Sequence, residues 1–478
     1  MDVLIGREEE KSRLREALDS GAPELIAIFG RRRVGKTFLV RQYCKDQLVF
    51  EFTGARDAGL AEQLENFQKA LQKATGRRLY KTPGKWAEAF DQLTDFLERR
   101  LKKERTVIFL DEFPWLNTHK SGFLSAFDHW WNSWANQQTK LVVIICGSAA
   151  SWMIRHIVNN KGGLHNRITR KIRLMPFNLR ETAAYFRARN IQLDHYQIIQ
   201  LYMVMGGVPH YLKEVRKGES AAQTIDRVCF TKDGALYSEF ANLYHSLFED
   251  ASRHIAVVKA LTRTKTGMTR SELIAAAQFT SGGWVTDLLD ELIESGFVSS
   301  WSPFDKKTKD SIYKLSDEFT HFYLKFMDGS KASGAGSWQS FSVTASWRSW
   351  SGLAFERCCL KHVPQIKKAL GIGGVYTEES AWRYQPRSKK EQGAQIDLLI
   401  DRKDFVINLC EIKFSEQAFV IDKKYAAELE NKRMVFKTET DTRKSVFLTL
   451  ITSFGLKENE YATRLVQNAV TMESLFQS

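Results

Sequence analysis

The sequence predicts an α/β protein of several domains, and three observations indicate this. The chain has 478 residues, which exceeds the usual size of one domain. Its amino-terminal third contains apolar runs of strand length that end in glycine, serine or acidic residues, as parallel strands do where ligands bind. Farther on the periodicity becomes helical, and strand patterns return near the carboxyl end. We therefore expect an open parallel sheet first and a second α/β domain last.

The first apolar run, Leu25 to Phe29, leads into Gly-Arg-Arg-Arg-Val-Gly-Lys-Thr at residues 30–37. This string fits the phosphate-binding loop G-x-x-x-x-G-K-[ST] at every fixed position, and the helical stretch Phe38 to Cys44 follows it. In such a loop the backbone N–H groups point inward, and the helix N-terminus adds partial positive charge. A chance Gly/Lys turn is the alternative, but it leaves the succession of strand, loop and helix unexplained. The sequence predicts binding of ATP, with Lys36 on the β- and γ-phosphates.

The second apolar run, Thr106 to Leu110, ends in the acidic pair Asp111 and Glu112. Asp111 is expected to hold Mg²⁺ together with Thr37, and Glu112 to polarise the attacking water. An acidic pair after a strand is a weak signal alone, because a solvated turn looks the same. Its combination with the upstream phosphate-binding loop favours the functional interpretation.

The third run, Leu141 to Cys146, ends in a small polar terminus that places Ser148 beside the γ-phosphate. This is similar to the sensor position of the ATPases associated with diverse activities. The residues expected to contact ATP are Gly30, Arg31, Arg32, Arg33, Val34, Gly35, Lys36, Thr37, Phe38, Asp111 and Ser148.

Two arginines, Arg167 and Arg170, lie in the stretch from Leu164 to Arg170, ahead of a fourth expected strand at Lys171 to Met175. Arginines at such a place often neutralise transition-state charge on a neighbouring subunit's nucleotide. We choose Arg167 over Arg170 for this catalytic role, which predicts an ATP-dependent homo-oligomer. A solvated basic turn is an equally good interpretation.

Composition limits the other possibilities. No segment approaches 18 consecutive apolar residues and no signal peptide is evident, so we expect a cytoplasmic protein with no membrane partner. The six cysteines show no CxxC spacing, which favours buried free thiols over a disulfide framework or a zinc site. The formal charge of +14 is typical of a protein with a polyanionic partner such as nucleic acid, although it equally fits a solubilising surface.

After the core at residues 1–175, the helical pattern of residues 176–250 resembles a lid, and residues 251–328 have the outline of a winged helix-turn-helix. Thr269 and Glu272 form a capping box, a second helix covers about Gly283 to Glu294, and two strand-like pieces flank Lys306 and Lys307. The second helix carries four acids, which phosphates would repel. This favours a role in protein contacts, whereas the two wing lysines are compatible with binding DNA.

A Gly/Ser/Ala-rich linker is expected at residues 329–338, followed by a domain over 339–478. There we expect a hairpin with strands at 393–400 and 405–414 and a turn at 401–404, carrying Asp397 on the first strand and Glu411 and Lys413 on the second. Glu356 is expected on a helix that begins near Gly352. Asp397, Glu411 and Glu356 would bind Mg²⁺, and Lys413 would stabilise the nucleophile or the transition-state charge.

This set is the PD-(D/E)xK nuclease pattern, an acid followed about a dozen residues later by Glu-x-Lys, with Ile396 where the name-giving pattern has proline. Alone the string is weak, because strands with such alternation are common on half-exposed sheets. Charged residues within apolar strands are costly unless they are paired or bind a metal, which strengthens it here.

Over nearly its whole length the chain resembles archaeal-type, AAA-like P-loop ATPases that carry a C-terminal PD-(D/E)xK nuclease-like domain. The resemblance rests on the phosphate-binding loop, residues 109–112, Gly147-Ser148, residues 206–209, the winged helix with residues 313–317, and Asp397 with residues 411–413. It implies a P-loop core, a helical lid, a winged helix and a restriction-endonuclease-like α/β domain. It also suggests DNA processing or defence against mobile DNA.

We therefore expect an ATPase whose module regulates or drives a metal-dependent nuclease-like domain acting on DNA. The alternative is a regulatory or signalling ATPase in which an inactive nuclease-like domain serves as an interaction platform. A transcription regulator is a third possibility, which the acidic second helix disfavours. Cleavage assays with magnesium and manganese separate the first two.

Overall fold

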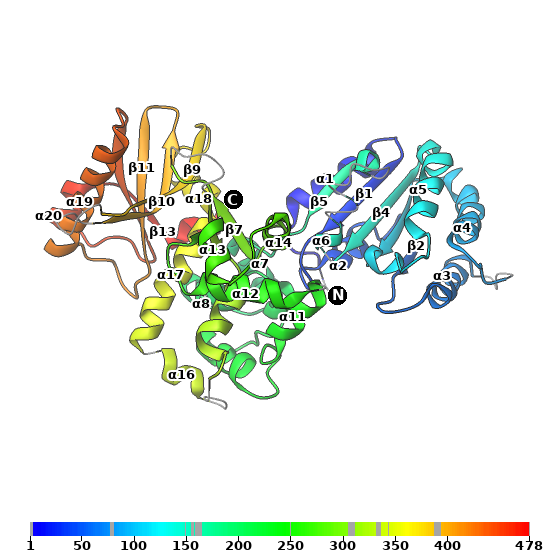
Figure 1. Ribbon diagram of the computed structural model, residues 1–478, viewed down its shortest axis with the longest axis horizontal. Coiled ribbons are helices and arrows are strands. Elements are labelled where there is room, and N and C mark those ends of the chain that lie inside the picture. Colours follow the sequence, from blue (N-terminus) through cyan, green and yellow to red (C-terminus); the bar gives the residue numbers. More distant parts are fainter. Residues whose placement is uncertain are drawn as a thin grey trace. The chain divides into compact units, whose positions relative to one another are not determined.

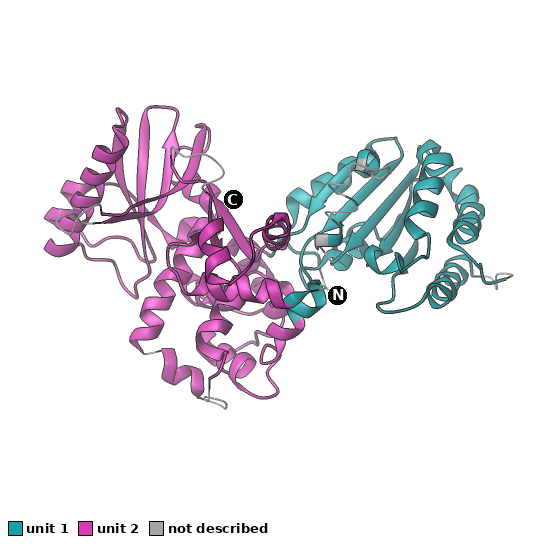
Figure 2. Ribbon diagram, viewed as in Figure 1, with its two compact units in different colours: residues 1–176, 243–251 teal, residues 177–242, 252–478 magenta. Residues whose placement is uncertain are grey.

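The computed structural model of the chain describes residues 3–76, 81–148, 150–153, 157, 165–248, 250–304, 311–330, 336–342, 344–386 and 393–477. The chain divides into two compact units (Figure 2). Unit 1 comprises residues 1–176 with 243–251, and unit 2 comprises residues 177–242 with 252–478. Each unit has a sheet and a hydrophobic core of its own.

Unit 1 contains a five-stranded parallel sheet in the order β2-β3-β4-β1-β5 (Figure 1). The central strands are continuous apolar runs because helices cover both faces of the sheet. The strands are β1 Glu24–Phe29, β2 Leu48–Thr53, β3 Thr106–Asp111, β4 Leu141–Gly147 and β5 Arg170–Arg173. The helices are α1 Glu8–Asp19, α2 Lys36–Tyr43, α3 Leu60–Thr75, α4 Trp86–Leu101, α5 Phe123–Ser133 and α6 Ala150–Met153.

Side chains of alternate strand residues lie on opposite faces of this sheet. On one face α3, α4 and α5 pack through an aromatic core in which the rings of Trp86 and Phe123 lie 4.8 Å apart. On the other face α1 and α2 cover smaller aliphatic residues, among them Leu14, Leu39 and Val142. The fourth expected strand lies at Arg170–Arg173 and ends two residues before Met175.

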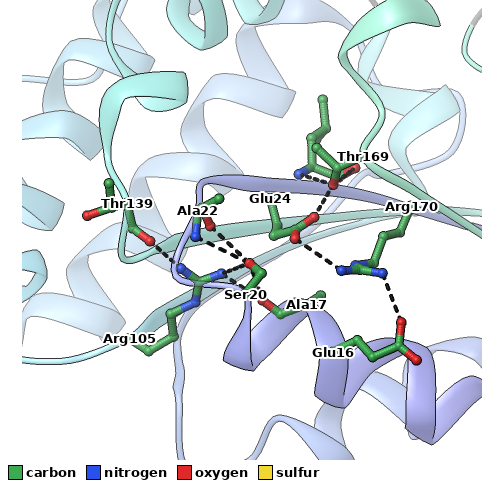
Figure 3. Close-up of polar contacts among 10 residues, drawn as sticks. Glu16, Ala17, Ser20, Ala22, Glu24, Arg105, Thr139, Thr169 and Arg170 are labelled. Atoms are coloured by element: carbon green, nitrogen blue, oxygen red, sulfur yellow. Dashed lines mark hydrogen bonds and ion pairs between the residues drawn. The ribbon is translucent and has the colours of Figure 1, made fainter.

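A polar network stabilises the amino end of β1 (Figure 3). Thr169 donates to the carboxylate of Glu24 and accepts a hydrogen bond from the backbone N of Leu25 at 3.1 Å. Arg170 pairs with Glu16 at 3.1 Å and with Glu24 at 3.5 Å. Because the phosphate-binding loop follows the carboxyl end of β1, these pairs lie at the far end of the strand from the loop. Arg170 is therefore a structural residue of unit 1.

Unit 2 contains a small antiparallel sheet, β6-β8-β7, and a five-stranded mixed sheet, β13-β12-β11-β10-β9. Its strands are β6 Met268–Thr269, β7 Val298–Trp301, β8 Ile312–Leu315, β9 Thr377–Tyr384, β10 Ala394–Arg402, β11 Val406–Lys413, β12 Ser445–Thr452 and β13 Val466–Thr471. In the mixed sheet β9, β10 and β11 run antiparallel, whereas β12 and β13 run parallel to β11.

Helices form much of the chain from residue 179 onward. They are α7 Leu179–Ala188, α8 His195–Met205, α9 Pro209–Leu212, α10 Ala221–Ile225, α11 Glu239–Leu247, α12 Ala251–Thr262, α13 Arg270–Ala276, α14 Gly283–Glu294, α15 Glu318–Phe322, α16 Ser337–Ser342, α17 Ala345–Lys361, α18 Val363–Ala369, α19 Lys423–Thr440 and α20 Glu460–Leu465. The capping box expected from Thr269 and Glu272 is present at the start of α13. Gly207 permits a close crossing, because a Cβ there would lie 1.7 Å from the carbonyl oxygen of Phe177.

The segments expected as separate lid, winged helix and carboxyl-terminal domain lie largely in one compact unit, except that residues 176 and 243–251 belong to unit 1. Trp338 stacks on Phe230 at 5.8 Å and packs edge-on against Phe322 and Trp347, both at 5.0 Å. His362 of α17's carboxyl end accepts a hydrogen bond from the backbone N of the first residue of α7 at 2.9 Å. Aromatic side chains from all three segments thus build a common core, which the local sequence patterns do not reveal.

Several expected boundaries are corrected by the structure. Residues 337 and 338, expected in the linker, belong to α16, where Trp338 is buried and its backbone N is held by Asp226 at 2.7 Å. The helix expected near Gly352 begins at Ala345, because Thr344 caps it. The hairpin turn is later than expected: Asp401 and Arg402 continue β10, and the left-handed residue Phe405, with φ of 68°, closes the turn.

Lys306 and Lys307, which were expected in the wing, and Leu164 lie outside the described residues. Among the described helices, none has the length and apolar character required to cross a membrane.

Candidate functional site

Asp397 lies on β10, and Glu411 and Lys413 lie on the adjacent antiparallel strand β11. Oδ2 of Asp397 accepts a hydrogen bond from the backbone N of Ile412 at 2.9 Å, which places this carboxylate against β11. Nζ of Lys413 lies 3.6 Å from Oε2 of Glu411. The structure therefore brings together the three side chains that the sequence placed on a hairpin.

Glu411 is the buried centre of this acidic cluster, with 1% of its surface exposed. Burial, together with the nearby charge of Asp397, raises the pKa of Glu411 to about 7, against the opposing effect of Lys432 and Lys413. Its Oε1 atom is buried and has no hydrogen-bond partner among the described residues. A buried carboxylate oxygen without a partner is costly, so this atom is suited to accept a cation.

Two residues of helix α19, Tyr425 and Lys432, contact Glu411 and were not predicted. Lys432 donates to Oε2 of Glu411 at 2.8 Å, and the hydroxyl of Tyr425 donates to the same oxygen at 3.3 Å. Nζ of Lys413 also lies 5.1 Å from the centre of the Tyr425 ring. The spacing of seven residues sets Tyr425 and Lys432 on one face of a helix. Nothing in the local sequence directs that face toward β11.

Glu356, on α17, lies within the electrostatic reach of the same cluster. Burial raises the pKa of Glu356, and the charge of Asp397 adds to the shift. Its Oε1 accepts a hydrogen bond from Lys314 of β8 at 3.2 Å. Glu356 is therefore a neighbour of Asp397, as expected, but it is also paired with a lysine that the sequence did not point to.

The cluster fits a divalent cation only in part. No group of three or more His, Cys, Asp or Glu side chains that could hold a metal ion occurs within the described parts of the chain. Mg²⁺ is commonly held by one or two carboxylates, with water and substrate phosphates completing its shell. Asp397 and the unpartnered Oε1 of Glu411 are the oxygen atoms that could serve in this way.

In unit 1 the phosphate-binding loop joins β1 to α2. Gly30 has φ of 143°, and a Cβ there would lie 2.3 Å from the carbonyl oxygen of Leu174. Arg33 and Gly35 have φ of 71° and 93°, so the loop curls through left-handed backbone. Gly35 precedes the first turn of α2 without a side-chain cap. The uncapped N–H groups of that turn are the donors that an anionic ligand needs.

Lys36 lies inside the curl of this loop and is 6% exposed. Its Nζ donates to the carbonyl oxygens of Gly30 at 3.0 Å and Arg31 at 2.9 Å. Burial lowers the pKa of Lys36, and the charges of Glu112 and Asp111 counteract this shift. A buried ammonium group that faces two loop carbonyls is positioned to exchange them for phosphate oxygens.

Side chains from α2, β3 and β4 meet at the carboxyl edge of the parallel sheet. Oγ1 of Thr37 donates to Oδ2 of Asp111 at 2.7 Å, so the two expected Mg²⁺ ligands are adjacent. Ser148, which follows β4, donates through its Oγ at 2.8 Å and its backbone N at 3.2 Å to Oε2 of Glu112. Glu112 itself has left-handed backbone, with φ of 46°. Such conformations are uncommon for residues other than glycine and often occur at functional sites.

Residues 4–215 match the family described as an ATPase domain predominantly from Archaea. The amino-terminal part of the chain is therefore similar to this family of ATPase domains. The lysine, the threonine and the acidic pair described above lie within the matched residues. The α/β fold with its parallel sheet is that of a P-loop ATPase, which agrees with the fold class expected for this part of the chain.

The chain is similar to two proteins of one archaeon and to a solved ATPase structure. An uncharacterized protein of Methanocaldococcus jannaschii is 23% identical over 419 residues, which are 87% of this chain and 88% of the relative. A second uncharacterized protein of that organism is 32% identical over 88 residues, 18% of this chain and 82% of the relative. Among solved structures, a Walker-type ATPase of Pyrococcus abyssi is 19% identical with a TM-score of 0.50, covering 68% of this chain and 96% of that chain. At that identity the likeness shows a shared fold.

The ATPase domain also uses a residue that sequence reasoning missed. Arg7, 4% exposed, donates to the carbonyl oxygens of Val34 at 3.1 Å and Met175 at 2.6 Å. It thereby ties the phosphate-binding loop to the segment after β5. An arginine at the start of a charged helix resembles any solvated residue, so no local signal marks it.

The two candidate arginines of the ATPase domain differ in their surroundings. Arg167 ends the 3₁₀ helix His165–Arg167 and is exposed, whereas Arg170 is held by Glu16 and Glu24. An arginine that acts on a neighbouring subunit must be free to leave its own subunit's surface. The arrangement therefore leaves Arg167 as the better candidate of the two.

Proposed function

We propose that the ATPase domain controls a metal-dependent, nuclease-like site in the carboxyl-terminal sheet, and that DNA is its substrate. The observation that carries this proposal is the convergence of Asp397, Glu411 and Lys413 at the β10–β11 pair, around a carboxylate whose pKa burial raises to about 7. Such shifted acids cluster at sites of chemistry, because burying a charge without a use for it costs stability.

Each residue of the cluster has a role in phosphodiester hydrolysis. Asp397 and Glu411 would hold Mg²⁺, and Glu356 would add negative charge from the neighbouring helix. Bound Mg²⁺ supplies charge neutralisation and an activated water. Lys413, which is part-exposed at the edge of the cluster, would stabilise the attacking hydroxide or the charge that develops on the phosphate.

In the ATPase domain, Lys36 would bind the β- and γ-phosphates while Thr37 and Asp111 hold Mg²⁺. Glu112, oriented by Ser148, would polarise the attacking water. We further propose that Arg167 acts on the nucleotide of a neighbouring copy, so that the protein assembles when ATP is bound. The residues were assigned these roles from the sequence, and their adjacency at one sheet edge supports the assignment.

DNA as the substrate is supported by the net charge of +14, which attracts a polyanion. We propose that residues 251–328 are a winged helix-turn-helix, on the basis of α12, α13, α14 and the β6-β8-β7 sheet. Helix α14 still favours a protein-contact role. Burial raises the pKa of Asp290 on this helix, and the charges of Asp287 and Glu291 contribute, as expected for a crowded acidic face.

The alternative function, a regulatory ATPase with an inactive nuclease-like domain, is favoured by one specific observation. The cluster's carboxylates are paired with lysines: Glu411 with Lys432 and Lys413, and Glu356 with Lys314. An acidic cluster neutralised by its own lysines can be stable without a metal ion. A cation that binds must displace at least part of this pairing.

The deciding experiment incubates the full-length protein with supercoiled plasmid and linear DNA, with Mg²⁺ or Mn²⁺, and with ATP, a non-hydrolysable analogue or no nucleotide. Cleavage that requires metal and responds to nucleotide supports the first function. ATP hydrolysis without cleavage of any DNA form favours the alternative. RNA and single-stranded DNA are included, because charge attraction alone does not distinguish between them.

A further inference from the structure

A cavity of about 70 Å³ lies where the β7–β8 pair meets helix α17, next to the acidic cluster (Figure 1 shows the elements). One wall is the end of α12 and the segment after it, with Lys265. The second is β7 and β8, with Lys314. The third is one face of α17, with Glu356, Arg357 and Lys361 at helical spacing.

The lining is strongly cationic, with four basic side chains and one carboxylate. Two of the cations are already neutralised: Lys314 by Glu356 at 3.2 Å and Lys361 by Glu318 at 2.6 Å. The remaining two are Arg357 and the exposed Lys265. The pocket therefore carries positive charge that its own acids do not balance.

Arg357 provides an independent indication of a ligand. Its Nε donates to the carbonyl oxygen of Leu315 at 3.1 Å, but its Nη1 is buried and has no hydrogen-bond partner among the described residues. Burial lowers the pKa of Arg357 to about 10, although Glu356 and Glu318 oppose this. A buried guanidinium donor without an acceptor is costly, and because Arg357 also lines the cavity, an anion there would lie against an incompletely bonded cation.

The size of the cavity limits the ligand. A cavity needs roughly 10–15 Å³ on the same measure to hold one water molecule, so 70 Å³ suits several waters or one tetrahedral oxyanion. A nucleoside would not fit beside the phosphate. Glu356 lines the cavity and also interacts with Asp397, so an anion held here would lie beside the residues proposed to cleave phosphodiesters.

We propose that this pocket receives the terminal phosphate monoester of a nucleic-acid strand, bound by Arg357 and Lys265, while the adjoining part of the strand reaches the Asp397–Glu411 cluster. The identification of the ligand as a strand end rests on the nuclease function proposed above. The anion site itself rests only on the cavity, its charge and the unpartnered guanidinium nitrogen.

The test measures binding of the full-length protein to short fluorescent single-stranded DNAs in EDTA and without ATP, so that no cleavage occurs. The strands are identical except for a 5′-phosphate, a 3′-phosphate or hydroxyl groups at both ends. One phosphorylated strand is expected to bind about tenfold more tightly than the hydroxyl-ended strand, because a charge-assisted bidentate contact forms. Equal affinity for all three strands overturns the proposal.

Matched variants locate the effect. Lys265→Glu and Arg357→Gln should abolish the preference for the phosphorylated strand. Arg348→Gln, on an exposed turn of the same helix and outside the pocket lining, should retain it. Lys265 is exposed, so its variant is expected to fold even where Arg357→Gln does not. A preference that survives Lys265→Glu overturns the assignment.

Two further results separate this inference from the nuclease function. At matched ionic strength, inorganic phosphate at tens of millimolar should weaken binding of the phosphorylated strand only. Should inorganic phosphate compete as strongly as the strand itself, the site is one for free phosphate and the strand-end assignment is wrong. A terminal-phosphate preference in a protein that cuts no nucleic acid supports the pocket and refutes the nuclease. Cleavage without any preference refutes the pocket alone.

Discussion

Ser148 donates two hydrogen bonds to a single oxygen of Glu112, one from its hydroxyl at 2.8 Å and one from its backbone N at 3.2 Å. The two residues follow neighbouring parallel strands, β4 and β3, and meet at the carboxyl edge of the sheet. The contact fixes the orientation of the carboxylate that is proposed to polarise water. It therefore links the polar residue after β4 to the residue proposed to activate water.

Replacing Ser148 with alanine removes the hydroxyl bond and leaves the backbone bond. We expect kcat for ATP hydrolysis to fall by about tenfold while nucleotide affinity stays within a factor of two or so, because Glu112 loses part of its orientation and the phosphates keep their ligands. Steady-state kinetics with equilibrium binding of a labelled analogue measure both. Ser148→Thr, which restores a hydroxyl, should recover activity. If Ser148→Ala hydrolyses ATP as fast as wild type does, Ser148 has no role in the site.

Lys36→Ala should abolish most nucleotide binding, since this buried ammonium is the loop's phosphate ligand, whereas Glu112→Gln should bind ATP and hydrolyse it very slowly. Lys45→Ala, an exposed lysine beyond helix α2, is the matched control and should behave as wild type. Filter or fluorescence binding and phosphate release test these variants. Wild-type affinity in Lys36→Ala would contradict the phosphate-loop assignment.

Arg167→Ala should bind ATP normally but hydrolyse it slowly, because the arginine is proposed to act on the nucleotide of a neighbouring copy. Mixing it with Lys36→Ala should partly restore turnover, since each variant retains the half-site that the other lacks. Arg170→Ala is expected instead to lower thermal stability, because it breaks the pairs with Glu16 and Glu24. Light scattering that finds only monomers with ATP would rule out the trans role.

Asp397→Ala and Lys413→Ala should each reduce metal-dependent DNA cleavage by on the order of a hundredfold or more, with ATP hydrolysis near wild type. Asp397→Ala should also weaken metal binding, whereas Lys413→Ala should retain it, which separates a ligand from an electrostatic catalyst. Lys403→Ala, an exposed lysine in the β10–β11 turn, is the control. Cleavage that persists in both variants indicates another site or a contaminating nuclease.

Glu411 should make stability depend on pH in a defined direction. Its pKa in the folded protein is raised to about 7, above the ordinary value of 4.5, so the native state binds the proton more tightly than the unfolded state. The contribution of Glu411 to the free energy of unfolding is therefore lost as pH rises from about 4.5 through 7. We expect the free energy of unfolding of Glu411→Gln relative to wild type to be higher at pH 8 than at pH 5, by on the order of 1–3 kcal/mol.

Thermal denaturation of both proteins at the two pH values tests this expectation. Adding Mg²⁺ at pH 8 should raise the melting temperature of wild type and not that of Glu411→Gln, because a ligand stabilises only the state that binds it. A difference between the two proteins that is independent of pH would show that Glu411 is ionised in both folded and unfolded states throughout this range.

The sequence by itself grouped the residues of the proposed nucleotide site, because each of them lies near the end of a strand. A parallel sheet brings the carboxyl ends of its strands to one edge, so Lys36, Asp111 and Ser148 could be grouped before any coordinates were known. It also placed Asp397, Glu411 and Lys413 on one hairpin, since side chains alternate along a strand. These inferences use only short-range geometry.

The tertiary structure decided what surrounds those residues. Tyr425 and Lys432 reach Glu411 because α19 packs across the sheet, and Lys314 reaches Glu356 because β8 lies against α17. Likewise the lid, winged-helix and carboxyl-terminal segments share one core through Trp338 and its aromatic neighbours. Periodicity identifies which face of an element is buried, but the partner of that face is chosen by packing between segments distant in the chain. The charge balance of the acidic cluster, and the cationic pocket beside it, follow from that packing.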